Sequence, residues 1–189
     1  NFFGLNTGYQ ATFATSSNFF GQNAGFTATD AGNSNFFGTN AGFNAFSAHS
    51  SNFIGLNAGN TADNARNSNF FGTNAGRNAF FAEYSNFIGT NAGSGASGAL
   101  NSIFIGTNAG LNDSVSNAGG EFTGDSSILI GNNTNTGGFS NSIAIGTDAR
   151  NTAANQFMLG STSTIDSAIN EIYLGKNDTN TFPLLYANL

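Results

Sequence analysis

The chain contains no cysteine or tryptophan, one proline and very few charged side chains. Without cysteine it forms neither disulfides nor thiolate metal sites, and its composition does not indicate a redox compartment. No apolar run approaches the ~18 residues that span a bilayer. Charged residues make up only 7% of the sequence, so solubility must come from asparagine, serine, threonine and glycine. The net charge of −6 is spread out without a basic patch, which argues against nucleic acid and anionic membrane surfaces as partners.

A glycine preceded by two large apolar residues recurs along almost the whole chain. The first seven copies are 17 residues apart, and four more follow after steps of 25, 15, 14 and 15. These bend glycines are Gly4, Gly21, Gly38, Gly55, Gly72, Gly89, Gly106, Gly131, Gly146, Gly160 and Gly175. Most of the 21 phenylalanines lie at fixed places in this repeat, which argues against disorder. A fixed period this short indicates a stacked solenoid.

The three residues before each bend glycine are mostly β-branched or aromatic and are bounded by Asn and Gly, which is typical of short strands. The sequence therefore predicts an all-β, parallel β-solenoid of about eleven coils of 14–17 residues. Four segments follow from the spacing. We expect regular 17-residue coils over 1–112, an inserted surface loop over 113–125, shorter coils over 126–178 and a C-terminal tail or connector over 179–189.

The last and middle residues of each strand point to opposite faces, yet both are apolar in nearly every copy. We assign the last position to the core of the coil: Phe3, Phe20, Phe37, Ile54, Phe71, Ile88, Ile105, Ile130, Ile145, Leu159 and Leu174. We assign the middle position to an apolar column that other copies cover: Phe2, Phe19, Phe36, Phe53, Phe70, Phe87, Phe104, Leu129, Ala144, Met158 and Tyr173. Exposed apolar stripes mark interfaces, and closed cyclic symmetry predicts a homotrimer.

Polar and small residues keep equally regular places. The first strand position is Asn in six coils and then becomes apolar, so we expect an asparagine ladder along the inward face. A second series, two residues after the bend glycine, should form corners with positive φ: Asn6, Asn23, Asn40, Asn57, Asn74, Asn91 and Asn108. Alanines seven and ten residues after the glycine should pack opposite the large side chains, while Thr12, Asp30, His49, Arg66 and Glu83 should face solvent.

The segment Asn141-Ser142-Ile143-Ala144-Ile145-Gly146-Thr147-Asp148-Ala149 resembles the head repeat of YadA-type trimeric autotransporter adhesins. That family forms a left-handed parallel β-roll of 14–15-residue coils, with three rolls about a central axis. The 17-residue coils resemble longer repeats in bacterial surface proteins and phage tail fibres. There, similar repeats precede a self-cleaving chaperone region, and Pro183-Leu184-Leu185-Tyr186 is similar to the segment that leads into it. The resemblance implies a left-handed trimer.

Motifs that could carry chemistry are few. Gly93-Ser94-Gly95-Ala96-Ser97-Gly98 matches a dinucleotide fingerprint, but no helical pattern follows it. His49, the only histidine, lies at a variable position, and the carboxylates share no repeat phase. A threonine row after the bend glycines is interrupted by Leu5, Gln22 and Leu56, which makes ice binding an unfavoured alternative. We therefore expect no catalytic, cofactor or metal site and no enzymatic activity.

These features favour a structural or adhesive segment of an extracellular or virion fibre that associates with copies of itself. The alternatives are a filament subunit that polymerises head to tail, and a tail-fibre segment that binds a receptor or degrades polysaccharide. A surface glycan or a protein receptor is a possible further partner. The chain begins inside a repeat, so we expect a processed protein or a fragment.

Overall fold

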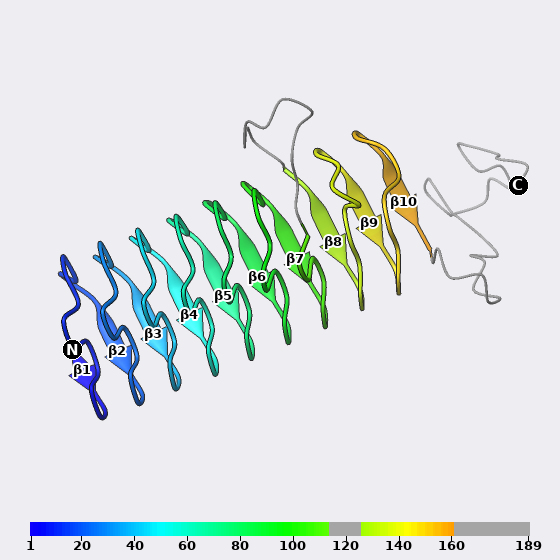
Figure 1. Cartoon of the computed structure of the whole chain (residues 1–189). Coiled ribbons are helices and arrows are strands. Elements are labelled where there is room, and N and C mark those ends of the chain that lie inside the picture. The colour runs from blue at the N-terminus through cyan, green and yellow to red at the C-terminus, as the bar shows by residue number, and fades with distance from the viewer. Residues whose placement is uncertain (114–125, 161–189) are drawn as a thin grey trace, which may run out of the picture.

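The computed structural model describes residues 1–113 and 126–160. Within these ranges the chain forms ten strands of two or three residues, all in one sheet (Figure 1). They are β1 (Phe2–Phe3), β2 (Asn18–Phe20), β3 (Asn35–Phe37), β4 (Asn52–Ile54), β5 (Asn69–Phe71), β6 (Asn86–Ile88), β7 (Ile103–Ile105), β8 (Ile128–Ile130), β9 (Ile143–Ile145) and β10 (Phe157–Leu159).

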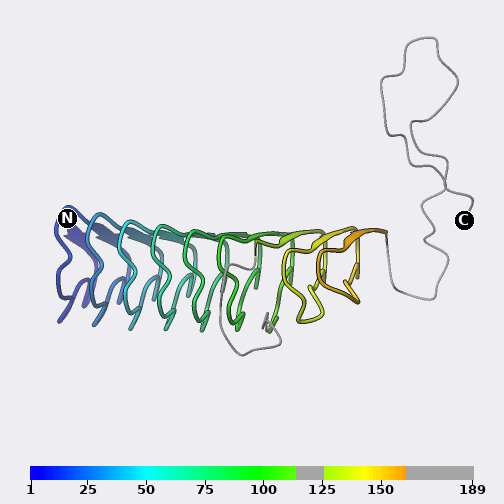
Figure 2. The same ribbon diagram turned by 90° about the horizontal axis from the view of Figure 1, so that it is seen from above.

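Every strand pairs in parallel with the strand of the next coil, and equivalent residues of the repeat are partners. Phe19 pairs with Phe36 and Phe36 with Phe53, and the same register continues to β10. The sheet therefore runs along one side of the rod, while the rest of each coil returns on the other sides (Figure 2). The predicted all-β parallel solenoid is confirmed. The expected eleventh coil at 172–174 and the tail over 179–189 lie outside the described residues.

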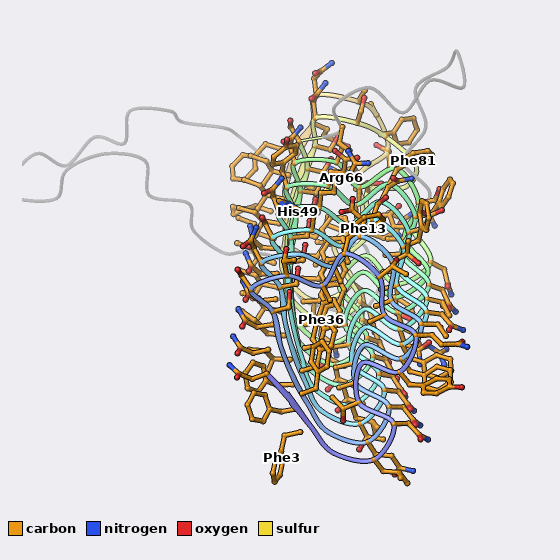
Figure 3. The ribbon with its side chains drawn as sticks, turned by 90° about the vertical axis from the view of Figure 1, so that its left-hand side faces the viewer. Phe3, Phe13, Phe36, His49, Arg66 and Phe81 are labelled. Atoms are coloured by element: carbon orange, nitrogen blue, oxygen red, sulfur yellow. The ribbon has the colours of Figure 1, made fainter. Side chains whose placement is uncertain are left out.

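The core of the coil is built from the middle strand position, so the assignment made from the sequence is wrong for both columns. Phe19, Phe36, Phe53, Phe70, Phe87 and Phe104 are fully buried in the coil, and Leu129 and Ala144 continue the column. Successive rings stack at 4.6–4.8 Å between centroids, and their planes differ by 4–11°. Figure 3, a view along the rod, places Phe36 inside the ribbon and Phe3 outside it. The two flanking positions of each strand therefore face outward.

The reason for the reversal lies in the size of the coil interior. Ala24, Ala28 and Ala31 are fully buried around Phe19, which confirms the predicted role of the alanines. A β-carbon on Gly25 would lie 2.4 Å from the Phe19 ring, so the ring occupies the space that a side chain there would need. One interior of 17 residues thus has room for a single large side chain and a wall of small ones.

The core column changes where the coils become shorter. Phe104 is followed by Leu129 and Ala144, and coil length falls from 17 to 15 and 14 residues along this part of the chain. In the 14-residue coil the buried side chain of Asn151 spans the interior and donates from Nδ2 to the carbonyl oxygens of Ile143 and Gln156. Shorter coils therefore combine a smaller apolar core residue with a polar cross-link.

Asp113, assigned from the sequence to the inserted loop, belongs to the coil. It is 2% exposed and occupies the same place as the inward-facing Ala79 and Ala96 of the preceding coils, since its carbonyl oxygen accepts from Ser97 N as that of Ala96 accepts from Phe80 N. The loop boundary at 113 is thus a correction, and the remainder of the predicted loop, 114–125, lies outside the described residues.

We predict that Phe53→Ala destabilises the fold by about 3–5 kcal/mol, because it opens a cavity in the ring stack. Phe13→Ala, at a side chain that is 77% exposed, should change stability by less than about 0.5 kcal/mol. Urea unfolding followed by circular dichroism measures both. Equal losses in the two variants would show that Phe53 is not a core residue.

Candidate functional site

The outward face of the ten-stranded sheet carries a continuous apolar column, which we call the outer column. Because the middle strand position points inward, the last position points out. The members remain partly or fully exposed: Phe3, Phe20, Phe37, Ile54, Phe71, Ile88, Ile105, Ile130, Ile145 and Leu159. Phe20 and Phe37 are each 36% exposed although their rings stack at 4.9 Å, and Ile54 is 44% exposed. Within one chain, stacking along the rod cannot cover this column.

Beside the outer column, the first strand position divides the face into two zones. In β1 to β6 the position before or at the strand start is asparagine, and each Nδ2 donates to the next Oδ1 at 2.7–2.8 Å. This ladder joins Asn1, Asn18, Asn35, Asn52, Asn69 and Asn86. From β7 onward Ile103, Ile128, Ile143 and Phe157 replace it. The predicted ladder exists, but it lies on the outward face and not in the core.

No charged residue lies on this face in the described strands β1 to β10. The exposed residue after each bend glycine is also uncharged, from Leu5 through Thr39 to Thr147. The charged residues of the described ranges belong to other parts of the coil: Asp30, Asp63, Arg66, Arg77, Glu83, Asp113, Asp148 and Arg150. The sheet face is therefore flat, partly apolar and electrostatically neutral.

The corner asparagines behave as predicted. All seven, from Asn6 to Asn108, have φ between 53° and 58°. Each Nδ2 donates to Oδ1 of the next corner at 2.9–3.2 Å, and the series continues through Asn133 to Asp148. Asp148 accepts from Asn133, but an ionised carboxylate has no proton to donate onward. An aspartate can therefore end such a ladder but cannot extend it.

Sequence reasoning missed a third, buried ladder of serines that precede the strands. They are Ser17, Ser34, Ser51, Ser68, Ser85, Ser102, Ser127 and Ser142. The hydroxyl of Ser34 donates to the carbonyl oxygen of Ala48 at 2.6 Å and accepts from Ser51 N at 3.1 Å. The signal was present, since serine occupies this position in all eight described coils that precede a strand from β2 on, apart from the final one. Its regularity indicated a backbone partner of fixed geometry.

Asp113 forms a separate polar centre next to the point where the regular coils end. Its two carboxylate oxygens accept from Thr136 N and Thr136 Oγ1, both at 2.7 Å. In regular coils the corresponding amides, such as Asn64 N and Phe81 N, donate to a backbone carbonyl of the preceding coil. The Asp113 side chain thus serves as the acceptor for Thr136 N. Burial raises the pKa of the Asp113 carboxyl, and the hydrogen bonds from Thr136 and the charge of Arg150 oppose that shift.

The structure does not assemble the other sequence motifs into a nucleotide or metal site. Gly93 has φ 61°, and a β-carbon there would strike the Phe87 ring, so this glycine serves coil packing. The segment 93–98 lies in turns and a bridge, without a helix after it. In the described ranges, no three histidine or acidic side chains are grouped where they could hold a metal ion.

His49 lies in a bend at the surface (Figure 3). Its Nδ1 is 2.9 Å from Ser50 Oγ, and its Nε2 is 3.4 Å from Asn33 Nδ2. The group beside the second ring nitrogen is a neutral amide, and His49 and Ser50 are both partly exposed. The arrangement resembles ordinary surface hydrogen bonding and shows no carboxylate that would orient the ring as a general base.

Comparison with known proteins gives no relative for this chain: no family model matches it, and no curated protein matches it. Among the described residues there is no helix of a length and apolarity that would cross a membrane. The outward face of the sheet is therefore the strongest candidate site on structural grounds alone.

We predict that Asn52→Asp lowers stability by about 1–2 kcal/mol at neutral pH, because aspartate accepts from Asn35 but presents an oxygen to Asn69 Oδ1. Asn60→Asp, which lies outside both asparagine ladders, is the matched control and should change stability much less. Urea unfolding is the measurement. A loss of the same size in the control would assign the effect to net charge.

We also predict a pH dependence from Asp113. Its raised pKa means that the folded chain binds a proton more tightly than the unfolded chain. The stability contributed by protonation is present below the ordinary aspartate value of 3.8 and is lost as pH rises through the raised folded value. Unfolding curves from pH 7 down to 5 should show stability rising at this site, and Asp113→Asn should remove that component. An unchanged pH profile in the variant would contradict the assignment.

Proposed function

We propose that this chain is a structural segment of a fibre and associates with copies of itself through the outward face of the sheet. The observation that carries the proposal is the outer column, which stays exposed along ten strands of one rod. Contiguous exposed apolar surface on a soluble chain marks an interaction site. The sequence located such a stripe on the middle strand position, and the proposal now rests on the last position instead.

The absence of charge in the described strands supports a second copy as the partner. Identical surfaces that meet bring identical charges close together, and like charges across an interface cost free energy. The columns of Phe, Ile and Asn on the outward face contain no charged side chain, so copies can approach without this penalty. An adhesive or charged ligand would leave no comparable reason for a neutral face.

The zones of the face also support association of coils at the same level. Asparagine amides have donors and acceptors left for another amide, whereas Ile103, Ile128 and Ile143 offer only apolar surface. Like zones meet when copies lie parallel, and unlike zones meet when they are antiparallel. A closed trimer about an axis along the rod satisfies this condition, and it agrees with the resemblance of 141–149 to adhesin heads. We place such a rod outside the cell or on a virion.

Light scattering coupled to size exclusion tests the proposal. The wild-type chain should elute with about three times its 19.4 kDa mass. Replacing Ile54 and Ile88 by aspartate should give the monomer mass with unchanged circular dichroism, since both side chains already face water in one rod.

Phe13→Asp is the matched control, because Phe13 is exposed but lies away from the strands. It should retain the oligomer mass. A monomeric wild-type chain would end the proposal, and so would dissociation of the control to the same extent as the double variant.

A further inference from the structure

A second wall of the coil carries a line of outward-facing residues paired by isolated parallel bridges, which we call the bridge column. Its members are Thr12, Thr29, Phe46, Asp63, Phe80 and Ser97. Within it, Asp63 is bracketed by two aromatic side chains, because it pairs with Phe46 on one side and with Phe80 on the other. We propose that Asp63, Phe46 and Phe80 bind a substituted ammonium ion.

The carboxylate of Asp63 has an unmet need for a partner. Its main-chain groups are paired: the amide donates to the carbonyl oxygen of Ala79 at 2.9 Å, and the carbonyl oxygen accepts from Phe81 N at 3.1 Å. Its Oδ1, however, is buried and has no hydrogen-bond partner. A carboxylate oxygen removed from water without a compensating partner raises the free energy of the folded chain. A bound cation would supply the missing interaction.

The residues on either side determine the kind of cation. Phe46 is 51% exposed and Phe80 is 38% exposed, so neither ring is fixed under other parts of the chain. The two residues lie two rungs apart, about 9.6 Å at the spacing of parallel strands. A cation between them lies within the ~6 Å at which ring faces attract positive charge. Phe81 packs edge-on against Phe80, with centroids 4.2 Å apart, and limits the orientations of that ring.

A metal ion does not fit this environment. Calcium needs six to eight oxygen ligands, and the described residues hold no group of three acidic or histidine side chains. One carboxylate with aromatic side chains on both sides is instead the chemistry that recognises methylated ammonium groups. Choline and trimethylated lysine share this cation, one as a lipid headgroup component and the other as a protein side chain. The site is independent of the self-association face.

Isothermal titration of the full chain with tetramethylammonium chloride, at constant ionic strength set by sodium chloride, tests the proposal. We expect a dissociation constant of about 1 mM. Asp63→Asn should weaken binding about tenfold, and Phe46→Leu about fivefold, because each removes one component of attraction while keeping similar size. Asp30→Asn and Phe13→Leu, at neighbouring surface positions, should bind as the wild type does.

Three results would overturn the proposal: no heat of binding up to ~50 mM, equal weakening by Asp30→Asn and Asp63→Asn, or undiminished binding by Phe46→Leu. Circular dichroism checks that each variant folds, and Phe80→Leu replaces any variant that does not. Phosphocholine and Nε-trimethyl-lysine amide serve as further arms. Tighter binding of one of them than of tetramethylammonium supports the site and indicates the source of the cation, whereas exclusion of both contradicts it.

Discussion

The stack of phenylalanine rings inside the coil is the interaction on which the rest of the structure depends. Parallel pairing sets consecutive coils one strand spacing apart, and rings such as Phe36 and Phe53 then meet face to face at 4.8 Å. The same spacing aligns every other residue type with its own copy. The side-chain amides of asparagine and the hydroxyls of serine thus form ladders, because identical groups with both a donor and an acceptor can repeat indefinitely.

The narrow interior explains both the composition and the location of the candidate site. A coil that holds one ring and several alanines buries little apolar surface for its length, and the ladders compensate by pairing the polar groups that line the corners and the serine row. The second apolar residue of each strand, such as Ile54 or Ile88, finds no room inside and remains on the surface. The proposed interface is thus a direct result of how small the coil is.

The interruptions of the repeat follow the same rule. Where the coils shorten, Leu129 and Ala144 replace phenylalanine, and Asn151 and Asp113 bring polar groups into the interior with hydrogen bonds to the main chain. Asp148 accepts from the last corner asparagine and cannot donate onward. The bridge column differs, since no structural constraint accounts for an aspartate between two exposed phenylalanines.

The 17-residue period, the strand positions, the parallel solenoid and the asparagine corners were determined by the amino-acid sequence alone, because periodic placement of Gly, Asn and Phe leaves few other ways to pair the strands. Sequence reasoning also recognised that each strand has apolar residues on both faces. It could not decide which face is inside. Alternation relates Phe53 to Ile54 but has no preferred sign, and only the closed coil, with Gly59 and the alanines opposite the ring, shows that Phe53 is enclosed and Ile54 is exposed.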